Sequence, residues 1–157
     1  MVEIKWCLGV KNGLELVEIN LNMSESYLKM ASESLEELRN VSSKIWTAST
    51  AYYTMYYSLY ALMMKIGVKC EIHNCSIEFM NKFLMDFYDD EDADAIKSGF
   101  RIRNDLQYYP GKLVREEELD NLKKDSMNFF VKTKEIISKI SENEIKKIRG
   151  EIKSYAK

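Results

Sequence analysis

The chain has 157 residues, of which 46% are hydrophobic and 31% are charged, and it contains one proline and six glycines. A chain of this length suits one domain with its own core, so it does not need metal or disulfide staples to fold. The formal net charge of −2 excludes binding to nucleic acid through bulk charge, and any RNA contact has to be local. Few helix breakers and many Lys, Glu, Leu, Met and Ile favour long helices.

The expected location is the cytoplasm. Residues 1–5 lead into no apolar core with a small-residue cleavage site, so we expect no signal peptide. The most apolar stretch, Ala51 to Met64, is interrupted by Thr, Ser and tyrosines and is too short to span a bilayer. We therefore expect no membrane association.

The cysteines are expected to be reduced thiols. Cys7, Cys70 and Cys75 are an odd number in a chain without a recognisable export signal. Cys70 and Cys75 flank His73, but this spacing is not that of a zinc knuckle, and no second pair completes four ligands. We expect no metal and no other cofactor.

The first 21 residues contain short apolar runs and two glycines, and they predict an N-terminal arm that packs on the body. The first long helix is expected to begin near Asn22 or Ser24 and to end at Asn40. Its apolar residues recur at steps of three and four, as on one face of an amphipathic helix. These residues are Tyr27, Leu28, Ala31, Leu35 and Leu38.

A second helix is expected from about Lys44 to Ile66, after the capping candidates Ser42 and Ser43 and before Gly67. Its middle is apolar nearly all round, so other helices or a second subunit have to surround it. Its tyrosines are interpreted as core or dimer packing in preference to a stacking platform for RNA bases. They are Tyr52, Tyr53, Tyr56, Tyr57 and Tyr60.

Three further helices are expected. The third is capped by Asn74 or Ser76, the fourth begins in the acidic run 86–94 and stops at Pro110, and the fifth runs from near Val114 to Ile140. A capping-box pattern at 141–144 precedes a charged tail that either continues this helix or starts a short one.

The chain as a whole, residues 1–157, is therefore expected to be a single all-α domain. We expect an up-and-down bundle of four to five antiparallel helices, with the N-terminal arm at one end of the sequence and the charged helical tail at the other. The core is expected to span about residues 21–140.

Three segments carry a resemblance to a known family. The first is the aromatic helix 51–62 (AYYTMYYSLYAL), the second is the glycine-to-histidine turn 67–73, and the third is 103–109 (RNDLQYY) near a helix end. In this order and at these spacings the chain resembles the HEPN family, whose helical domains are often encoded beside minimal nucleotidyltransferases. The resemblance covers about residues 21–140.

The resemblance implies a homodimer in which the arginine motifs of two subunits face one cleft. Many members cut RNA without a metal: the motif arginine holds the scissile phosphate, and a histidine four to six residues later assists proton transfer. Other members bind nucleotides or regulate a partner, and a partner nucleotidyltransferase can transfer a nucleotide monophosphate onto a tyrosine by the motif. In this chain Tyr108 stands at the histidine position.

Arg103 is the candidate phosphate ligand, because a guanidinium is always charged and can grip two phosphate oxygens. Asn104 is its polar neighbour in the binding motif. Tyr108, with an ordinary pKa of about 10, is a poor general base, but it can donate a hydrogen bond to phosphate or stack on a base. Tyr108 and Tyr109 are also candidate modification acceptors. His73 is a further candidate at the binding site, although a structural role is favoured for it.

Alternatives exist for the charged residues of the motif. Arg103 near a helix end is also explained as a C-terminal charge or as an ion-pair partner of the acidic run. Asp105 either pairs with an arginine, for example by holding Arg103 in place, or is simply exposed.

These predictions lead to three hypotheses about function. The leading hypothesis is a HEPN-like component of a toxin–antitoxin-like two-component module with a nucleotidyltransferase partner, binding nucleotide or RNA phosphate in a dimer cleft. The second is an active metal-independent endoribonuclease, in which Tyr108 or His73 replaces the motif histidine beside Arg103. The third is a non-catalytic structural or adaptor helical dimer.

Overall fold

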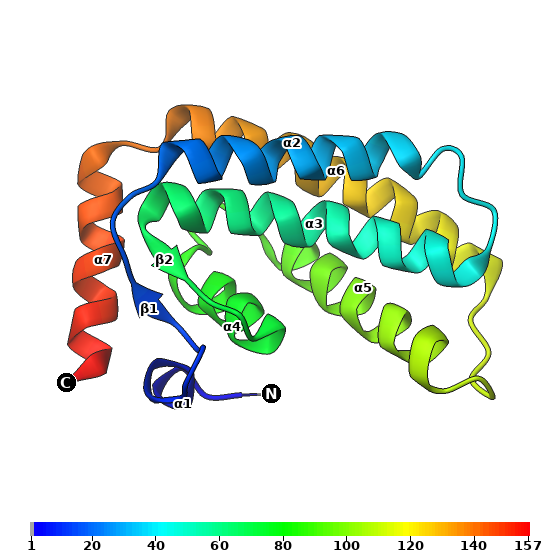
Figure 1. Cartoon of the computed structure of the whole chain (residues 1–157), viewed down its shortest axis with the longest axis horizontal. Coiled ribbons are helices and arrows are strands. Elements are labelled where there is room, and N and C mark those ends of the chain that lie inside the picture. The colour runs from blue at the N-terminus through cyan, green and yellow to red at the C-terminus, as the bar shows by residue number, and fades with distance from the viewer. Residues whose placement is uncertain (1) are drawn as a thin grey trace.

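The computed structural model describes residues 2–157, which form seven helices and one two-stranded sheet (Figure 1). The helices are α1 (Ile4–Gly9), α2 (Leu21–Glu37), α3 (Lys44–Ile66), α4 (His73–Phe83), α5 (Asp90–Tyr108), α6 (Glu116–Lys139) and α7 (Glu142–Ala156). The strands β1 (Glu15–Leu16) and β2 (Val68–Lys69) pair antiparallel. The prediction of an all-α fold is confirmed. None of the helices in the described chain has the length and apolarity needed to cross a membrane.

Helices α2, α3, α5 and α6 form the antiparallel bundle, with α3 in contact with the other three (Figure 1). Tyr52, Met55 and Leu59 of α3 are completely buried. Tyr56 and Tyr60 are also buried, so the packing interpretation is confirmed for these tyrosines. Helices of the same chain bury this face of α3, and a second subunit is not required for that purpose.

Helix α5 approaches α3 closely at Gly99. A Cβ atom at this position would lie 2.8 Å from Met55 Cε and 3.4 Å from Tyr52 Cδ2. Because glycine lacks a side chain, the two helices can pack at this short separation. Arg103 follows one helical turn later on the same side of α5, and it is thereby brought over the tyrosines of α3.

The ends of α3 and α7 follow the expected capping patterns. In contrast, α4 begins at His73 without the expected cap from Asn74 or Ser76, and α2 begins after the cap Asn20, earlier than expected. Ser43 accepts a hydrogen bond from the Trp46 backbone N–H at 3.2 Å and caps α3. Gly67 ends α3 with a φ of +85°, a conformation that favours glycine, and the Arg149 guanidinium occupies the space where a Cβ would lie. Ser141 and Glu144 form the predicted capping box of α7.

The N-terminal arm and the C-terminal helix pack together at one end of the bundle. Ile4 of α1 is buried, as are Ile145, Ile148 and Ile152 of α7. These isoleucines recur at steps of three and four, so α7 presents one apolar face despite its many charges. The charged tail is therefore a separate packed helix, and the core includes residues on both sides of 21–140.

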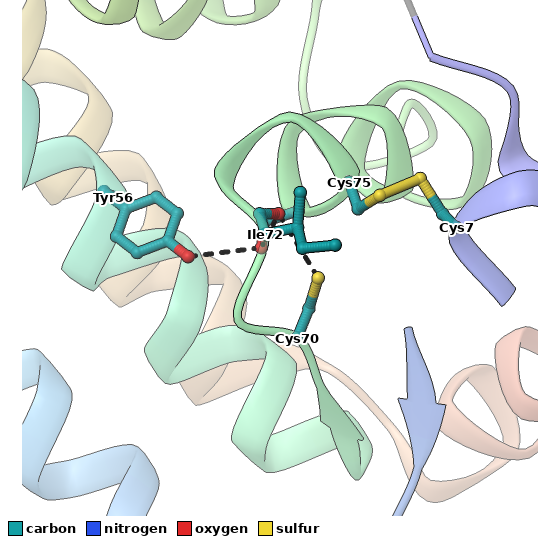
Figure 2. The surroundings of a disulfide bond; sticks show 6 residues. Cys7, Tyr56, Cys70, Ile72 and Cys75 are labelled. Carbon is teal, nitrogen blue, oxygen red and sulfur yellow. Dashed lines mark hydrogen bonds between the residues drawn. A yellow bond between two sulfur atoms is a disulfide. The ribbon is translucent and has the colours of Figure 1, made fainter. Parts of the chain in front are cut away.

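A disulfide joins Cys7 of α1 to Cys75 of α4, so the expectation of three reduced thiols is wrong for this pair (Figure 2). The two cysteines are separated by 68 positions, and the packing of α1 on α4 brings their Cα atoms within 5.5 Å. Such a tertiary contact is not visible in cysteine number or spacing. Cys70 remains a buried thiol that donates to the Ile72 carbonyl at 3.3 Å, and burial raises the pKa of this thiol.

Candidate functional site

Arg103 lies over the aromatic side chains of α3. Its guanidinium carbon is 5.7 Å from the ring centre of Tyr52 and 5.2 Å from that of Tyr53. These are cation–π distances, and they orient the guanidinium without neutralising it. Arg103 Nη1 also donates to Asn104 Oδ1 at 3.2 Å. The structure thus brings together the first two residues of the predicted binding motif.

The positive charge of Arg103 has no carboxylate partner in the part of the chain that the structure describes. Within residues 2–157, Arg103 forms no ion pair, and its buried Nε has no hydrogen-bond partner. Arg101 instead pairs with Asp105 at 3.5 Å and with Glu118 at 3.7 Å. A second cation, Lys112, contacts Asp105 at 2.9 Å. Asp105 therefore pairs with an arginine as expected, but with Arg101 and not with Arg103. Within the described residues Arg103 does not pair with the acidic run 86–94, and its charge is available to an anionic ligand.

His73 belongs to the same cluster of side chains. It is the first residue of α4, and its Nδ1 lies 2.7 Å from the Tyr52 hydroxyl. Its ring stacks on Tyr56, with ring centres 4.1 Å apart. Burial, and then the nearby positive charge of Arg103, lower the pKa of His73 below its ordinary value. The imidazole is therefore neutral at pH 7.

Tyr52 links the histidine to the arginine. Burial raises the pKa of Tyr52, so its phenol stays protonated and acts as a hydrogen-bonding group, not as a base. If the phenol donates to Nδ1, the imidazole carries its proton on Nε2 and can donate to a ligand. In the other tautomer Nδ1 donates to the phenol, and Nε2 is free to accept a proton. Either arrangement combines an anion-binding cation with a neutral imidazole.

A hollow of about 410 Å³ opens beside Arg103, between α2, α3 and α5. We call it the Arg103 hollow. Helix α5 contributes Arg103 and Gln107, and α2 contributes Met30, Glu33, Ser34 and Glu37. Helix α3 contributes Trp46, Ser49, Thr50, Tyr53 and Tyr57. This volume lies within the usual range for small-molecule sites.

The two motif tyrosines point elsewhere. Tyr108 and Tyr109, at the end of α5, are 65% and 57% exposed, and neither lines the Arg103 hollow as the structure describes it from residue 2 onward. Five residues correspond to about 140° around a helix, so Arg103 and Tyr108 face different directions. The structure therefore does not bring Tyr108 to Arg103 within one chain. Lys112 lies over the ring of Tyr109 at 5.2 Å.

Sequence reasoning missed Gln107 and Trp46. Gln107 lies four residues after Arg103, the spacing that shares a helix face, and its Nε2 donates to Ser49 Oγ at 3.2 Å. Trp46 lines the same hollow from the first turn of α3 and is 62% exposed. A helical projection of α5 would have identified Gln107, but no sequence pattern connected Trp46 to Arg103.

No metal centre accompanies this arrangement in the part of the chain that the structure covers: residues 2–157 contain no cluster of three His, Cys, Asp or Glu side chains suited to a metal ion. Comparison with known protein families found no family model that matches the chain, and comparison with curated proteins found no match either. The case for function therefore depends on the residues around Arg103.

Proposed function

We propose that this protein is a HEPN-like helical protein in which Arg103 binds the phosphate of a nucleotide or of RNA. The observation that supports this most directly is the Arg103 guanidinium, which has no carboxylate partner among residues 2–157 and lies over Tyr52 and Tyr53 at the edge of a hollow. A guanidinium without a carboxylate partner keeps its full positive charge, and an anionic ligand can pair with it.

The surroundings of Arg103 suit a phosphate. Hydrogen bonds between a guanidinium and phosphate oxygens are charge-assisted and can form in pairs, and partial burial strengthens them. The neutral His73 contacts Tyr52, which lies under Arg103, but it is not among the described residues that line the Arg103 hollow. Because His73 carries no charge at pH 7, it adds no second cation.

Calorimetric titration with inorganic phosphate and with nucleoside monophosphates tests the proposal. Arg103→Gln keeps a polar side chain but removes the charge, and we expect it to weaken binding about 10- to 100-fold, the worth of one or two charge-assisted hydrogen bonds. Arg101→Gln is the matched control on the same helix and should bind like the wild type. Equal affinities for wild type and Arg103→Gln would refute the proposal.

The proposal includes a homodimer and a nucleotidyltransferase partner. Supporting it, four large side chains are exposed where α3 begins and in the segment around the end of α5. They are Ile45, Tyr108, Tyr109 and Leu113. Light scattering gives the mass in solution, and Leu113→Asp should convert a dimer to a monomer. Because Leu113 is 96% exposed, this substitution should leave the fold of the subunit intact.

The exposed Tyr108 and Tyr109 are the proposed acceptors of a nucleotide monophosphate. After co-expression with a nucleotidyltransferase encoded by a neighbouring gene, peptide mass spectrometry should find the added nucleotide on Tyr108 or Tyr109. The double variant Tyr108→Phe, Tyr109→Phe keeps the aromatic surface and should remain unmodified. Modification elsewhere would contradict this part of the proposal.

A cytoplasmic location is also part of the proposal. The Cys7–Cys75 disulfide counts against it, because disulfides accumulate in oxidising compartments and are rare in the cytosol. Fractionation of the native cells, with detection of the protein beside a cytoplasmic marker, is the test. Recovery of the protein with a marker of an oxidising compartment would refute this part of the proposal.

The link between His73 and Arg103 favours a second candidate, a metal-independent endoribonuclease in which His73 takes the place of the motif histidine. Incubation of the purified protein with RNA in EDTA is the test. Cleavage should disappear in both His73→Asn and Arg103→Gln and should persist in Tyr108→Phe. Intact RNA with the wild-type protein rules this candidate out.

A further inference from the structure

We infer that the Arg103 hollow takes a single nucleotide whose base carries an exocyclic amine, and not a stretch of RNA. The phosphate contacts Arg103, the base stacks on Trp46, and the amine donates to Glu33 or Glu37. This inference rests on the proposed function, because it names the ligand of the same site. The charges, the exposed tryptophan and the carboxylates of the hollow carry it.

The charges of the hollow favour a single nucleotide over an RNA strand. Arg103 contributes one positive charge, whereas Glu33 and Glu37 on α2 contribute two negative charges. On the α2 side of the hollow, Lys29 Nζ lies 3.9 Å from a carboxylate oxygen of Glu33. An RNA strand brings one phosphate per nucleotide and needs clustered Lys and Arg, and each added phosphate meets the same carboxylates. A mononucleotide brings a single phosphate, and Arg103 is the one cation among residues 2–157 that lines the hollow to receive it.

Trp46 supplies a surface for the base. Among the aromatic side chains of the hollow, Tyr53 lies under Arg103 at 5.2 Å, and Tyr57 packs against Tyr27 and Tyr53. Trp46 is instead 62% exposed at the start of α3. Any base can stack on an exposed indole, and such stacking strengthens binding by about tenfold or more. The tryptophan therefore favours a ligand with a base over phosphate alone.

The carboxylates favour some bases over others. Carboxylates such as those of Glu33 and Glu37 accept hydrogen bonds without donating any. Adenine, cytosine and guanine carry an exocyclic amine that donates to a carboxylate, whereas the one donor on the pairing edge of uracil or thymine, the N3–H, lies between two carbonyls. A carboxylate that approaches this N3–H is repelled by the carbonyls beside it. Gln107, whose Nε2 already donates to Ser49, presents its carbonyl oxygen as one more acceptor.

Titration with AMP, UMP, adenosine, inorganic phosphate and a single-stranded ten-nucleotide oligoadenylate tests the inference. We expect AMP to bind about tenfold tighter than UMP or inorganic phosphate, with a weak dependence on salt between about 50 and 200 mM. We expect the oligoadenylate to bind no tighter than AMP. The double variant Glu33→Gln, Glu37→Gln should give AMP and UMP similar affinities, because amides accept and donate.

Tryptophan variants locate the base. Trp46→Ala should weaken AMP binding about tenfold without changing the affinity for inorganic phosphate, and Trp46→Phe should restore most of it. Trp6→Ala removes a 50% exposed tryptophan on α1 and is the matched control, with unchanged affinity. Far-ultraviolet circular dichroism establishes that each variant is folded.

The possible failures are distinguishable. If the oligoadenylate binds far tighter than AMP, with a steep salt dependence that Arg103→Gln abolishes, the inference is overturned and phosphate binding at Arg103 stands. Equal binding of AMP and UMP, or no effect of Trp46→Ala on AMP, also overturns the inference alone. If no phosphate compound binds, or if Arg103→Gln changes nothing, the proposed function fails with it.

Discussion

The two ends of the bundle use their arginines in opposite ways. At the end where α1, α7 and the sheet meet, Arg149 Nη1 lies within hydrogen-bonding distance of the carbonyls of Val17, Ile66 and Gly67, at 2.8 to 3.1 Å. Toward the other end, where α3 begins and α5 ends, Arg103 lies on tyrosine rings with its Nε unpartnered among residues 2–157 (Figure 1). We call these the closed end and the open end.

The difference separates a structural arginine from a binding one. Arg149 satisfies backbone carbonyls left free at the end of α3 and ties the N-terminal arm to α7. Arg103 satisfies no backbone group of the described chain, and the large side chains around the open end are exposed. The closed end should therefore dominate the free energy of unfolding, and the open end should dominate ligand binding.

The largest expected effect is at the closed end, on removing the disulfide. The double variant Cys7→Ser, Cys75→Ser should lose about 4 kcal/mol of unfolding free energy, because the bond closes a loop of 68 positions in the unfolded chain. Urea unfolding of the variant and of the oxidised wild type measures the loss. Reduced wild-type protein should match the variant, and a variant as stable as the oxidised protein would contradict the prediction.

Arg149→Ala should have the next largest effect, a loss of about 3 kcal/mol, since it leaves three carbonyls without their charged donor. Arg103→Ala is the matched substitution at the open end. It should cost about 1 kcal/mol, the worth of its contacts with the tyrosine rings. Urea unfolding of both variants measures the two losses. Equal losses of unfolding free energy would contradict the prediction.

His73 should give a smaller, pH-dependent effect. Its pKa is lowered in the folded protein, chiefly by burial, so the unfolded chain binds a proton at higher pH. Its contribution to stability is complete above the unfolded pKa of about 6.5 and decreases as the pH falls below it. Urea unfolding at about pH 7.5 and 5.5 should therefore show a larger decrease for wild type than for His73→Asn. Parallel decreases would exclude this role.

The smallest effect is expected for the exposed tyrosines of the open end. Tyr108→Ser should change the unfolding free energy by less than about 0.5 kcal/mol, because the side chain is 65% exposed. Tyr52→Phe is the buried comparison: it removes the hydroxyl that contacts His73 and should cost about 1 kcal/mol. Thermal unfolding of both variants measures the difference. A large loss for Tyr108→Ser would mean that it supports the fold.

Much of the fold was predictable from local patterns. The bounds of α3, its capping serine and its terminal glycine follow from residues next to one another in the chain. The capping box before α7 also follows from neighbouring residues. The three buried isoleucines of α7 did not predict an apolar face, because charged residues surround them in the sequence. The N-terminal arm offered no periodicity, so its short helix and strand could not be predicted.

The candidate site was predictable only in part. The residues themselves determined that Arg103 lies late in a helix beside Asn104, because helix-forming patterns and stops act over a few residues. Only the tertiary structure decided that His73 contacts Tyr52, that Trp46 lines the Arg103 hollow, that Tyr108 turns away from Arg103, and that Cys7 meets Cys75. These relations depend on how the helices cross and which faces they bury, and such packing joins residues that no local pattern connects.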